Sequence, residues 1–588
     1  MTSRSSKTRR GAAHVLPERH RGRWDGRTPV GELPARAAAR WGDRESLVFG
    51  AARQSFAEIA RRVDEAAKGL IALGVAPGDK VCLWLNNCPE WVHLLFAIAR
   101  IGAILVPANT RFRTGDIEYV VRQGDCSTLI THDVSGPVDY LAMVRELVPE
   151  SGAGCGTAPL RSERFPLLER IVTVSDREHP GAAAYPALVE AGRSVSDADL
   201  AARAAAVAVD DTLFIMFTSG TTGFPKGVMR NHHLLRNQCD RMERLAITEA
   251  DVVLNYLPLF HIFGYVDGPL LSVMAGSRQV LTASFDPDEC VGLVETERAT
   301  QMQGFDSHLK ALMDAQERRP RDTSSLRIGF FPSGMASSVP IVRRVREVFP
   351  TMQTLTAYGS TEGGANICTS FLDSSEEQRC ETSGHPCDGF EIRIADPESG
   401  EELPPRAPGE ILVRSYNLMQ GYYRKPVETA AAIDSEGWLR SGDLGYLRED
   451  GYLRFLGRCK DMIKVGGENV DPVEVEQLLL EHPAVCAAAV VAYPDERMTE
   501  VAVAFVVPRE ERDAGPGAGC ESESRAERDA RRDALAREIL ELGRGRVASF
   551  KLPRHVLFVA ELPMTSSGKV RKAELRDLAL ARLGAAAG

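Results

Sequence analysis

The 588-residue sequence has no long apolar run and few aromatic residues, which make up 6% of the chain. No segment approaches the ~20 apolar residues that a membrane-spanning helix needs. The basic stretch 1–23 is not followed by an apolar segment, so it does not predict a secretory signal, and we expect residues 1–25 to form a disordered basic tail. Basic residues are also outnumbered, 71 Lys and Arg against 81 Asp and Glu. The net charge of −10 argues against general nucleic-acid or anionic-membrane binding.

The twelve cysteines include no Cys-x-x-Cys pair. Cys380 and Cys387 are the closest pair in the central region, but no ligand set with zinc-site spacing surrounds them. Scattered cysteines of this kind are typical of reduced thiols, and we expect a cytoplasmic protein.

The chain is longer than one hydrophobic core normally organises. A helix is expected over 55–73, opened by a capping box at Ser55 and Glu58, and another over 91–101. Strands are expected over 80–85 and 103–107. This alternation predicts an α/β fold with largely parallel sheets.

Two domains are predicted, a large N-terminal one of β-sheets packed with helices and a small, mobile α+β one at the C-terminus. We set the boundary between residues 26–458 and 459–588, because Gly457-Arg-Cys-Lys-Asp461 follows a strand pattern. Residues 508–532 are rich in Gly, Ser and charge and are expected to be a disordered insertion within the small domain.

The most informative segment is Thr218-Ser-Gly-Thr-Thr-Gly-Phe-Pro-Lys-Gly227, which follows a short apolar run that predicts a strand. Its glycines allow backbone N–H groups to converge on an anion, and its hydroxyls and lysine supply further donors. It is not a Walker A loop, because Lys226 is not followed by Ser or Thr at the start of a helix. A polar surface turn is the alternative, but the ordered ten-residue pattern after a strand favours a polyphosphate site.

Five further motifs follow in order: Tyr256–Gly264, Tyr358–Gly363, Ser441–Tyr446, Gly457–Asn469 and Pro563–Lys569. Together with 218–227 they resemble the acyl-adenylate-forming superfamily, and within it the acyl-CoA synthetases. The resemblance runs from about residue 30 to about residue 575. It implies two half-reactions, in which a carboxylate first attacks the α-phosphate of ATP and a thiol then displaces AMP.

The resemblance also implies roles in ATP binding. Tyr358 would stack on adenine, while Asp443 and Arg458 would hydrogen-bond to the ribose. The β- and γ-phosphates would be held by the loop residues Thr218, Ser219, Gly220, Thr221, Thr222, Gly223 and Lys226. Taken singly, Tyr358 is also compatible with a core aromatic residue, Asp443 with a turn cap and Arg458 with a surface ion pair.

The catalytic residues implied by the resemblance are Lys569, Thr361, Glu362 and His261. Glu362 would carry Mg²⁺, a hard cation that prefers carboxylate and phosphate oxygens, and Thr361 would contact the α-phosphate. Lys569 would bridge the substrate carboxylate and the α-phosphate, its cation screening two like charges; alone it would be a solvated lysine.

Three more positions concern the thiol and the hinge. Lys460 matches the hinge about which the small domain swings, although an exposed lysine is equally consistent with the local sequence. Gly466 and Gly467 would line the coenzyme A channel, because glycine permits close backbone approach.

The expected acyl pocket contains His261, Gly334, Met335 and Ala357. Phe260-His261 lacks the aspartate that amino-acid-activating relatives use to pair with a substrate ammonium, which favours a plain carboxylic acid. Met335 and Ala357 add volume where many members have glycine, so the pocket is expected to be shorter or differently bent. Asp306 and His308 either offer polar contacts to an oxygenated or aromatic acid or lie outside the pocket.

The sequence therefore predicts an ATP- and Mg²⁺-dependent acid–CoA ligase acting on a hydrophobic (fatty or aryl) acid. An enzyme that loads an acyl carrier protein is the alternative, because it shares the first half-reaction. A nucleotide-binding regulator without catalysis is disfavoured by the presence of Glu362, Asp443, Arg458 and Lys569.

Overall fold

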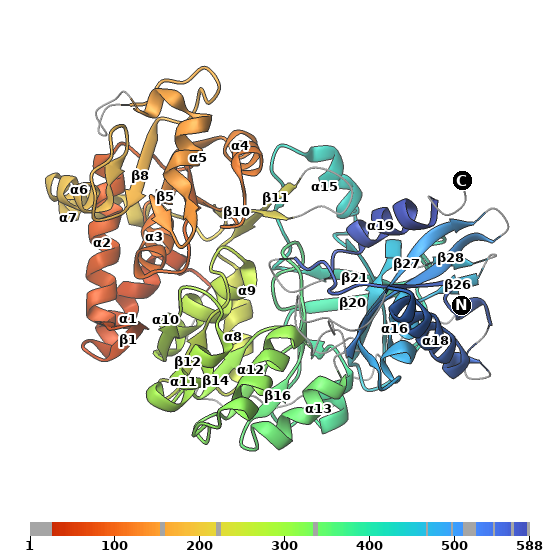
Figure 1. Cartoon of the computed structure of the whole chain (residues 1–588). Helices are drawn as coiled ribbons and strands as arrows, with labels where there is room; N and C mark the ends of the chain where they lie inside the picture. Colours follow the sequence, from red (N-terminus) through yellow and green to blue (C-terminus); the bar gives the residue numbers. More distant parts are fainter. Residues whose placement is uncertain are drawn as a thin grey trace, which may run out of the picture.

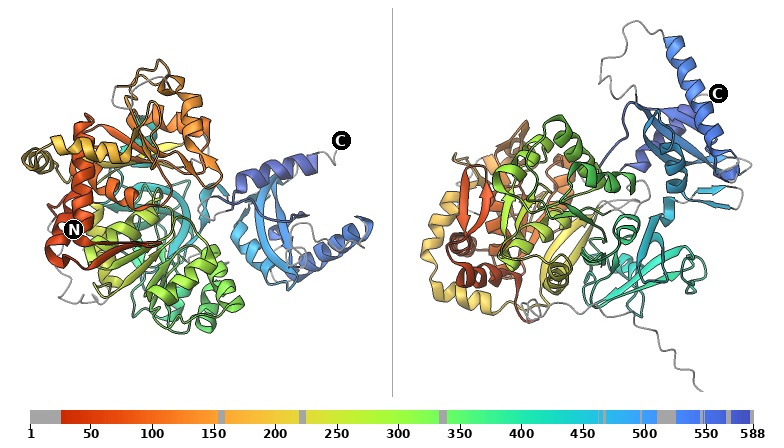
Figure 2. Two further views of the ribbon diagram at one scale, coloured as in Figure 1. Left: turned by 60° about the vertical axis from the view of Figure 1, so that its left-hand side comes forward. Right: turned by 90° about the horizontal axis from the view of Figure 1, so that it is seen from below.

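The computed structural model describes residues 26–152, 159–218, 225–332, 339–461, 463–465, 468–495, 498–509, 525–544, 547, 549–565 and 570–584. Sheets and helices alternate along the chain, and the last segment, from β25 (Ile463–Val465) onward, lies beside the rest as a separate unit (Figures 1 and 2). No helix in these ranges is both long enough and apolar enough to cross a membrane.

An eight-stranded sheet forms one half of the larger part. Its strands lie in the order β22 (Gly421–Tyr422), β11 (Lys226–Asn231), β10 (Thr212–Thr218), β4 (Ile104–Pro107), β3 (Lys80–Trp84), β5 (Cys126–His132), β8 (Arg170–Val174) and β9 (Ala183–Ala184). The strands from β10 to β9 are parallel, whereas β11 and β22 are antiparallel to their neighbours.

Both faces of this sheet are buried, which explains its apolar strands. Val81 and Leu83 of β3 belong to a core shared with α2 (Phe56–Ala72) and α3 (Pro89–Arg100). Cys82 and Trp84 point to the opposite face, because side chains alternate along a strand, and pack with α4 (Thr114–Gln123) and α5 (Tyr140–Leu147).

A seven-stranded sheet forms the second half. Its order is β16 (Gln353–Leu355), β15 (Ile328–Phe330), β14 (Gln301–Gln303), β12 (Val252–Asn255), β13 (Arg278–Leu281), β1 (Glu45–Phe49) and β2 (Ala52–Ser55), and β2 alone in this sheet is antiparallel to its neighbour. Leu254 and Met302 on its strands pack with α11 (Pro287–Glu297), α12 (Asp306–Arg318) and α13 (Val339–Val348).

Two smaller antiparallel sheets follow in the chain. The first has β17 (Ala357–Tyr358), β18 (Cys368–Thr369) and β19 (His385–Pro386). The second has β20 (Phe390–Ala395), β21 (Gly409–Ser415), β23 (Leu439–Leu447) and β24 (Leu453–Arg458). Tyr358, Val413 and Leu453 share one core, so the two sheets are packed together.

The C-terminal unit is built on β26 (Glu468–Val470), β25, β28 (Thr499–Pro508) and β27 (Val485–Asp495), with β29 (His555–Phe558) parallel to β28. Alternating residues of β28 pack on one face with α16 (Pro472–Leu480) and α18 (Arg525–Gly543), and on the other with α19 (Lys572–Gly584). A short 3₁₀ turn, Cys459–Asp461, leads from β24 to β25.

The predictions of individual helices and strands that rested on a helix cap or on hydrophobic periodicity are confirmed. The Glu58 N–H donates to Ser55 Oγ over 3.1 Å at the start of α2, and the two expected strands are β3 and β4. The prediction of irregular structure was wrong for 525–532, which begin α18. Alanine and alternating charges favour a helix there, although the composition alone suggested disorder; residues 510–524 lie outside the described ranges.

Candidate active site

One cleft contains all the predicted ATP-binding and catalytic residues that the structure describes. It is lined by Thr218, Lys226, His261, Tyr358, Thr361, Glu362, Asp443 and Arg458. These residues come from four separated stretches of the larger part, and Asp471 and Lys572 of the C-terminal unit line the same cleft.

The two ends of the predicted phosphate loop are paired in a sheet. Thr218 is the last residue of β10 and lies opposite Lys226, the first residue of β11. Thr218 Oγ1 donates to Glu362 Oε1 over 3.3 Å, and Lys226 Nζ lies 4.3 Å from the centre of the Tyr422 ring. The intervening Ser219, Gly220, Thr221, Thr222 and Gly223 lie outside the described residues.

Glu362 lies in the turn after β17, where an oxygen-rich group surrounds its carboxylate. The Tyr422 hydroxyl donates to Glu362 Oε1 over 3.4 Å, in addition to Thr218. Burial raises the pKa of Tyr422, and the negative charge of Glu362 raises it further, so the phenol stays protonated as a donor. The described part of the chain holds no group of three or more His, Cys, Asp or Glu side chains arranged for a metal ion.

Arg230 holds the backbone of this turn. Its Nη1 donates to the carbonyl oxygens of Thr361 and Glu362 over 3.2 and 3.4 Å, and its Nη2 donates to Asn417 Oδ1 over 2.6 Å. The guanidinium is fully buried, and burial lowers its pKa to about 10 against the opposing effect of Glu362. Arg230 was missed by the sequence analysis, although it shares a face of β11 with buried Val228, where a charge needs partners.

Asp443 and Arg458 are cross-strand neighbours on β23 and β24. Arg458 Nε lies 2.8 Å from Asp443 Oδ1, and the Tyr358 hydroxyl donates to Asp443 Oδ2 over 2.6 Å. The Tyr358 ring stacks on Phe455, with centroids 5.9 Å apart. Three residues from three different strands therefore form one connected group on the cleft wall.

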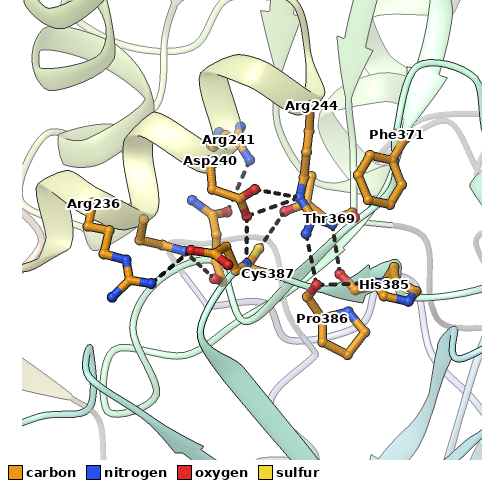
Figure 3. Close-up of polar contacts among 12 residues, drawn as sticks. Arg236, Asp240, Arg241, Arg244, Thr369, Phe371, His385, Pro386 and Cys387 are labelled. Carbon is orange, nitrogen blue, oxygen red and sulfur yellow. Dashed lines mark hydrogen bonds and ion pairs between the residues drawn. The ribbon is translucent and has the colours of Figure 1, made fainter. Parts of the chain in front are cut away.

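Figure 3 shows how α8 (Leu234–Arg244) anchors the small sheet that carries Tyr358. Arg244 forms a buried ion pair with Asp240 and donates to the carbonyl oxygens of Thr369, His385 and Pro386 over 2.8, 3.1 and 2.8 Å. Asp240 Oδ2 also accepts from the Asp388 N–H over 3.0 Å. Since β18 pairs with β17, these contacts position Tyr358 indirectly.

His261 lies where the cleft becomes apolar. Its Nδ1 accepts from the Phe263 N–H over 3.3 Å at the start of α9 (Ile262–Tyr265), and its ring lies edge-on to Phe305. Ala357 also lines the cleft, and its assignment to an acyl pocket stays a prediction, whereas Gly334 and Met335 lie outside the described residues.

The sequence left the roles of Asp306 and His308 on α12 open, and the structure places these two side chains differently. Asp306 lines the cleft. His308 Nδ1 instead accepts from the Phe305 N–H over 3.2 Å, and burial lowers the His308 pKa to about 4, so it is a neutral helix cap.

The remaining predicted residues belong to the C-terminal region. Lys460 lies in the 3₁₀ turn between β24 and β25, next to Asp461, whose Oδ1 is 2.6 Å from Arg576 Nη2 on α19. Gly466, Gly467 and Lys569 lie outside the described residues, so their predicted roles stay predictions.

Two family models match the chain that forms this fold and cleft. Residues 34–423 match the family model for AMP-binding enzymes, and residues 474–569 match the model for the AMP-binding enzyme C-terminal domain. The chain therefore belongs to the AMP-binding enzyme family.

Relatives over nearly the whole chain have matching names. The putative acyl-CoA synthetase YngI of Bacillus subtilis is 32% identical over 93% of this chain and 96% of its own length. The mitochondrial medium-chain acyl-CoA ligase ACSF2 of Mus musculus is 31% identical over 94% of this chain and 87% of its own length. The third relative is a propanoyl:CoA ligase of Mycobacterium tuberculosis, whose name describes an acyl group with a methyl-dioxo-octahydroindenyl ring system. It is 36% identical over 91% of this chain and 96% of its own length.

Solved structures share the fold. The anthranilate CoA ligase AuaEII with anthranoyl-AMP superposes with a TM-score of 0.79 at 24% identity, over 95% of this chain and 99% of that one. ATP-bound MatB from Rhodopseudomonas palustris gives a TM-score of 0.76 at 25% identity, over 93% of this chain and 99% of MatB. The predicted family, the α/β fold and the AMP-forming acyl-CoA synthetase class are thus confirmed.

Proposed function

We propose that the protein activates a hydrophobic carboxylic acid with ATP and transfers the acyl group to coenzyme A. The acid carboxylate attacks the α-phosphate, pyrophosphate leaves, and the product is an acyl-AMP. The coenzyme A thiol, losing its proton, then attacks the acyl carbonyl, and AMP leaves. The observation that carries the proposal is the convergence of Thr218, Glu362 and the Tyr358–Asp443–Arg458 group on one cleft.

This arrangement supports the proposed nucleotide-binding roles. Asp443 is buried and accepts from Tyr358, which suits it to bind ribose hydroxyls through its remaining lone pairs. Arg458 adds a cation beside the same sugar. Thr218 and Lys226 stand at the two ends of the loop that would hold the departing phosphates, so the protein's main contribution is positioning and charge neutralisation.

The same cleft suits Mg²⁺. Glu362 offers a carboxylate next to the Thr218 and Tyr422 hydroxyls, which are hard oxygen donors. One carboxylate is a sufficient protein ligand for an ion that takes its other ligands from phosphates and water. When bound, the ion would neutralise phosphate charge.

Lys569 and the hinge complete the proposal. We assign Lys569 to the substrate carboxylate and the α-phosphate, and residues 459–588 to a lid that swings about Lys460 and brings Gly466 and Gly467 to the site for the second half-reaction. Supporting this, the chain leaves one sheet at Arg458 and enters the other at Ile463, with only a short turn between.

The proposal of a hydrophobic acid is supported by the cleft wall near His261, because this wall includes the apolar rings of Phe263, Phe305 and Phe330. Relatives are named for medium-chain acids and for a ring-bearing propanoate, so the family tolerates different hydrocarbon shapes. A cytoplasmic location is supported by buried cysteines such as Cys88, Cys290 and Cys368, which have free thiols.

The test is pyrophosphate release with a panel of straight-chain, branched and ring-bearing acids, followed by detection of acyl-CoA. Formation of acyl-CoA that depends on ATP, acid and coenzyme A is expected. Acyl-AMP without acyl-CoA, together with loading of a holo carrier protein, would replace this proposal with the carrier-protein ligase.

A further inference from the structure

A buried polar group lies behind the apolar wall of the cleft. Asp267 and Asn366 line the cleft next to Val266, Phe330 and Ala365, yet they are only 0% and 4% exposed. Arg241, which is also 0% exposed, lies behind them. We call Arg241, Asp267 and Asn366 the polar floor.

The polar floor is held together by direct contacts. Arg241 Nε lies 2.6 Å from Asp267 Oδ1, and Arg241 Nη1 donates to Asn366 Oδ1 over 3.0 Å. The guanidinium carbon also lies 3.4 Å from the centre of the Phe330 ring. These contacts join α8, the π-helical segment Val266–Leu270 and the loop before β18.

The backbone around the floor is fixed too. Gln303 Nε2 donates to the Asp267 carbonyl oxygen, and Asn237 Nδ2 donates to the Asn366 carbonyl oxygen, both over 2.9 Å. The backbone of both residues is therefore held in place, and the Asp267 and Asn366 side chains cannot turn toward water without breaking their contacts with Arg241.

The polar floor has hydrogen-bond donors that its internal contacts do not use. Arg241 Nη2 is buried and makes no hydrogen bond with any residue in the described ranges, and the buried Asn366 Nδ2 has the Asp267 carboxylate beside it as an acceptor. The Asn366 amide lies close enough to the Asp267 carboxylate to lower its pKa, against burial, which raises that pKa to about 6. An amide nitrogen carries two N–H donors, so one can face Asp267 and the other is left for a ligand.

The charge balance limits what that ligand can be. Arg241 and Asp267 neutralise each other, so the floor offers hydrogen bonds without a net charge. A second carboxylate on the substrate would lie beside Asp267 and be repelled. A neutral oxygen can accept from Asn366 at no such cost, while the surrounding Val266, Phe330 and Ala365 pack against hydrocarbon.

Building on the proposed function, we propose that the preferred acid is oxygenated: its hydrocarbon part carries a keto or hydroxyl oxygen, remote from the carboxylate, that accepts a hydrogen bond from Asn366. A plain fatty acid would leave the buried donors unpaired. A site built to bond a substrate oxygen discriminates against the analogue that lacks it.

The test compares acids that differ only in this oxygen. Pyrophosphate release is measured for straight-chain saturated acids, for their keto and hydroxy analogues with the oxygen at each position, and for dicarboxylic acids of the same lengths. For at least one position, kcat/KM of the oxygenated acid is expected to exceed that of the plain acid by about tenfold or more. Dicarboxylic acids are expected to be poor substrates.

Two variants locate the effect. Asn366→Leu removes the amide, and Asn366→Asp removes the donor while keeping an acceptor for Arg241; both are expected to reduce the preference to about twofold or less. Ser307→Ala changes another polar residue of the cleft wall and is expected to leave the preference unchanged. The Kd values of matched acyl-sulfamoyl-adenosine pairs provide a readout that does not need turnover.

The outcomes separate this inference from the proposed function. Equal kcat/KM for plain and oxygenated acids in the unmodified enzyme, or a preference that both Asn366 variants retain, would refute the polar-floor inference while leaving the ligase intact. Absence of ATP-dependent acyl-CoA formation with every acid would overturn both.

Discussion

Tyr358 donates its hydroxyl hydrogen to Asp443 Oδ2 over 2.6 Å, while Arg458 Nε lies 2.8 Å from Oδ1 of the same carboxylate. Asp443 is thus held in one orientation by two partners from different strands. Burial and the Asp443 charge both raise the pKa of Tyr358, so it remains a phenol and a donor. The pair aligns the carboxylate before any nucleotide arrives.

Tyr358→Phe tests this alignment. It removes the hydroxyl but keeps the ring on Phe455, so we expect KM for ATP to rise about three- to tenfold, which corresponds to one lost hydrogen bond. Asp443→Asn should have a larger effect, because it removes the charge that Arg458 faces. Steady-state kinetics with varied ATP measures both, and a Tyr358→Phe enzyme with unchanged KM would contradict the aligning role.

Glu362→Gln keeps the shape of the side chain and removes its charge. We expect kcat for pyrophosphate release to fall by about a hundredfold or more, because a poorly neutralised polyphosphate is a poor leaving group. The Mg²⁺ concentration needed for half-maximal rate should also rise. Tyr422→Phe is the matched control, because it removes one neighbouring hydroxyl and should cost less than tenfold.

Lys569→Ala should separate the two half-reactions. Adenylation is expected to fall by at least about a hundredfold, since the charge between carboxylate and α-phosphate is lost, while chemically supplied acyl-AMP should still be converted to acyl-CoA. Lys551→Ala is the control, because Lys551 pairs with Glu474 at 2.7 Å within the C-terminal unit and should not affect adenylation. A normal rate of acyl-AMP formation by Lys569→Ala would exclude the assigned role.

The Asp240–Arg244 pair predicts a stability effect distant from catalysis. Asp240→Asn leaves Arg244 buried without its counter-charge, so we expect a loss of about 3–5 kcal/mol in the free energy of unfolding. Asp388→Asn breaks the exposed pair with Arg236 and should cost less than about 1 kcal/mol. Denaturant titrations compare the two variants, and equal losses would show that burial of the Arg244 network does not matter.

The buried His232 predicts a pH effect. Burial lowers its pKa to about 4, and its Nδ1 accepts from the Val30 N–H over 3.0 Å, so the folded protein holds the neutral ring. The unfolded chain takes up a proton near pH 6.5. The stabilising contribution is therefore complete above about pH 6.5 and is lost as the pH falls toward 4.

His232→Asn keeps an acceptor for Val30 and removes the titration. Between pH 4.5 and 6, the slope of unfolding free energy against pH should be smaller than that of the unmodified protein by up to about 1.4 kcal/mol per pH unit. Urea titrations at several pH values measure this slope. Parallel pH profiles for the two proteins would show that His232 is not held neutral.

The sequence could predict features that are local or that belong to an ordered motif. Ser55 caps α2 because its side chain reaches an N–H only three residues away, and the motif order identified Asp443 and Arg458 before their pairing across two strands was visible. Arg230, Asp240 and Asn366 could not be recognised in the same way. Their partners lie more than a hundred residues away for most contacts, so each resembles an ordinary surface polar residue until the chain is folded.

The contacts of Arg230 have a consequence for synthesis of the chain. Its partners Thr361, Glu362 and Asn417 are made 131 to 187 residues later, and the Asp443–Arg458 pair later still. Until those segments leave the ribosome, the guanidinium on β11 has none of these carbonyl and amide oxygens to bind. The nucleotide cleft is therefore among the last parts of the large unit to be assembled during translation, and a chain that stops before residue 361 would lack all three partners of the Arg230 guanidinium.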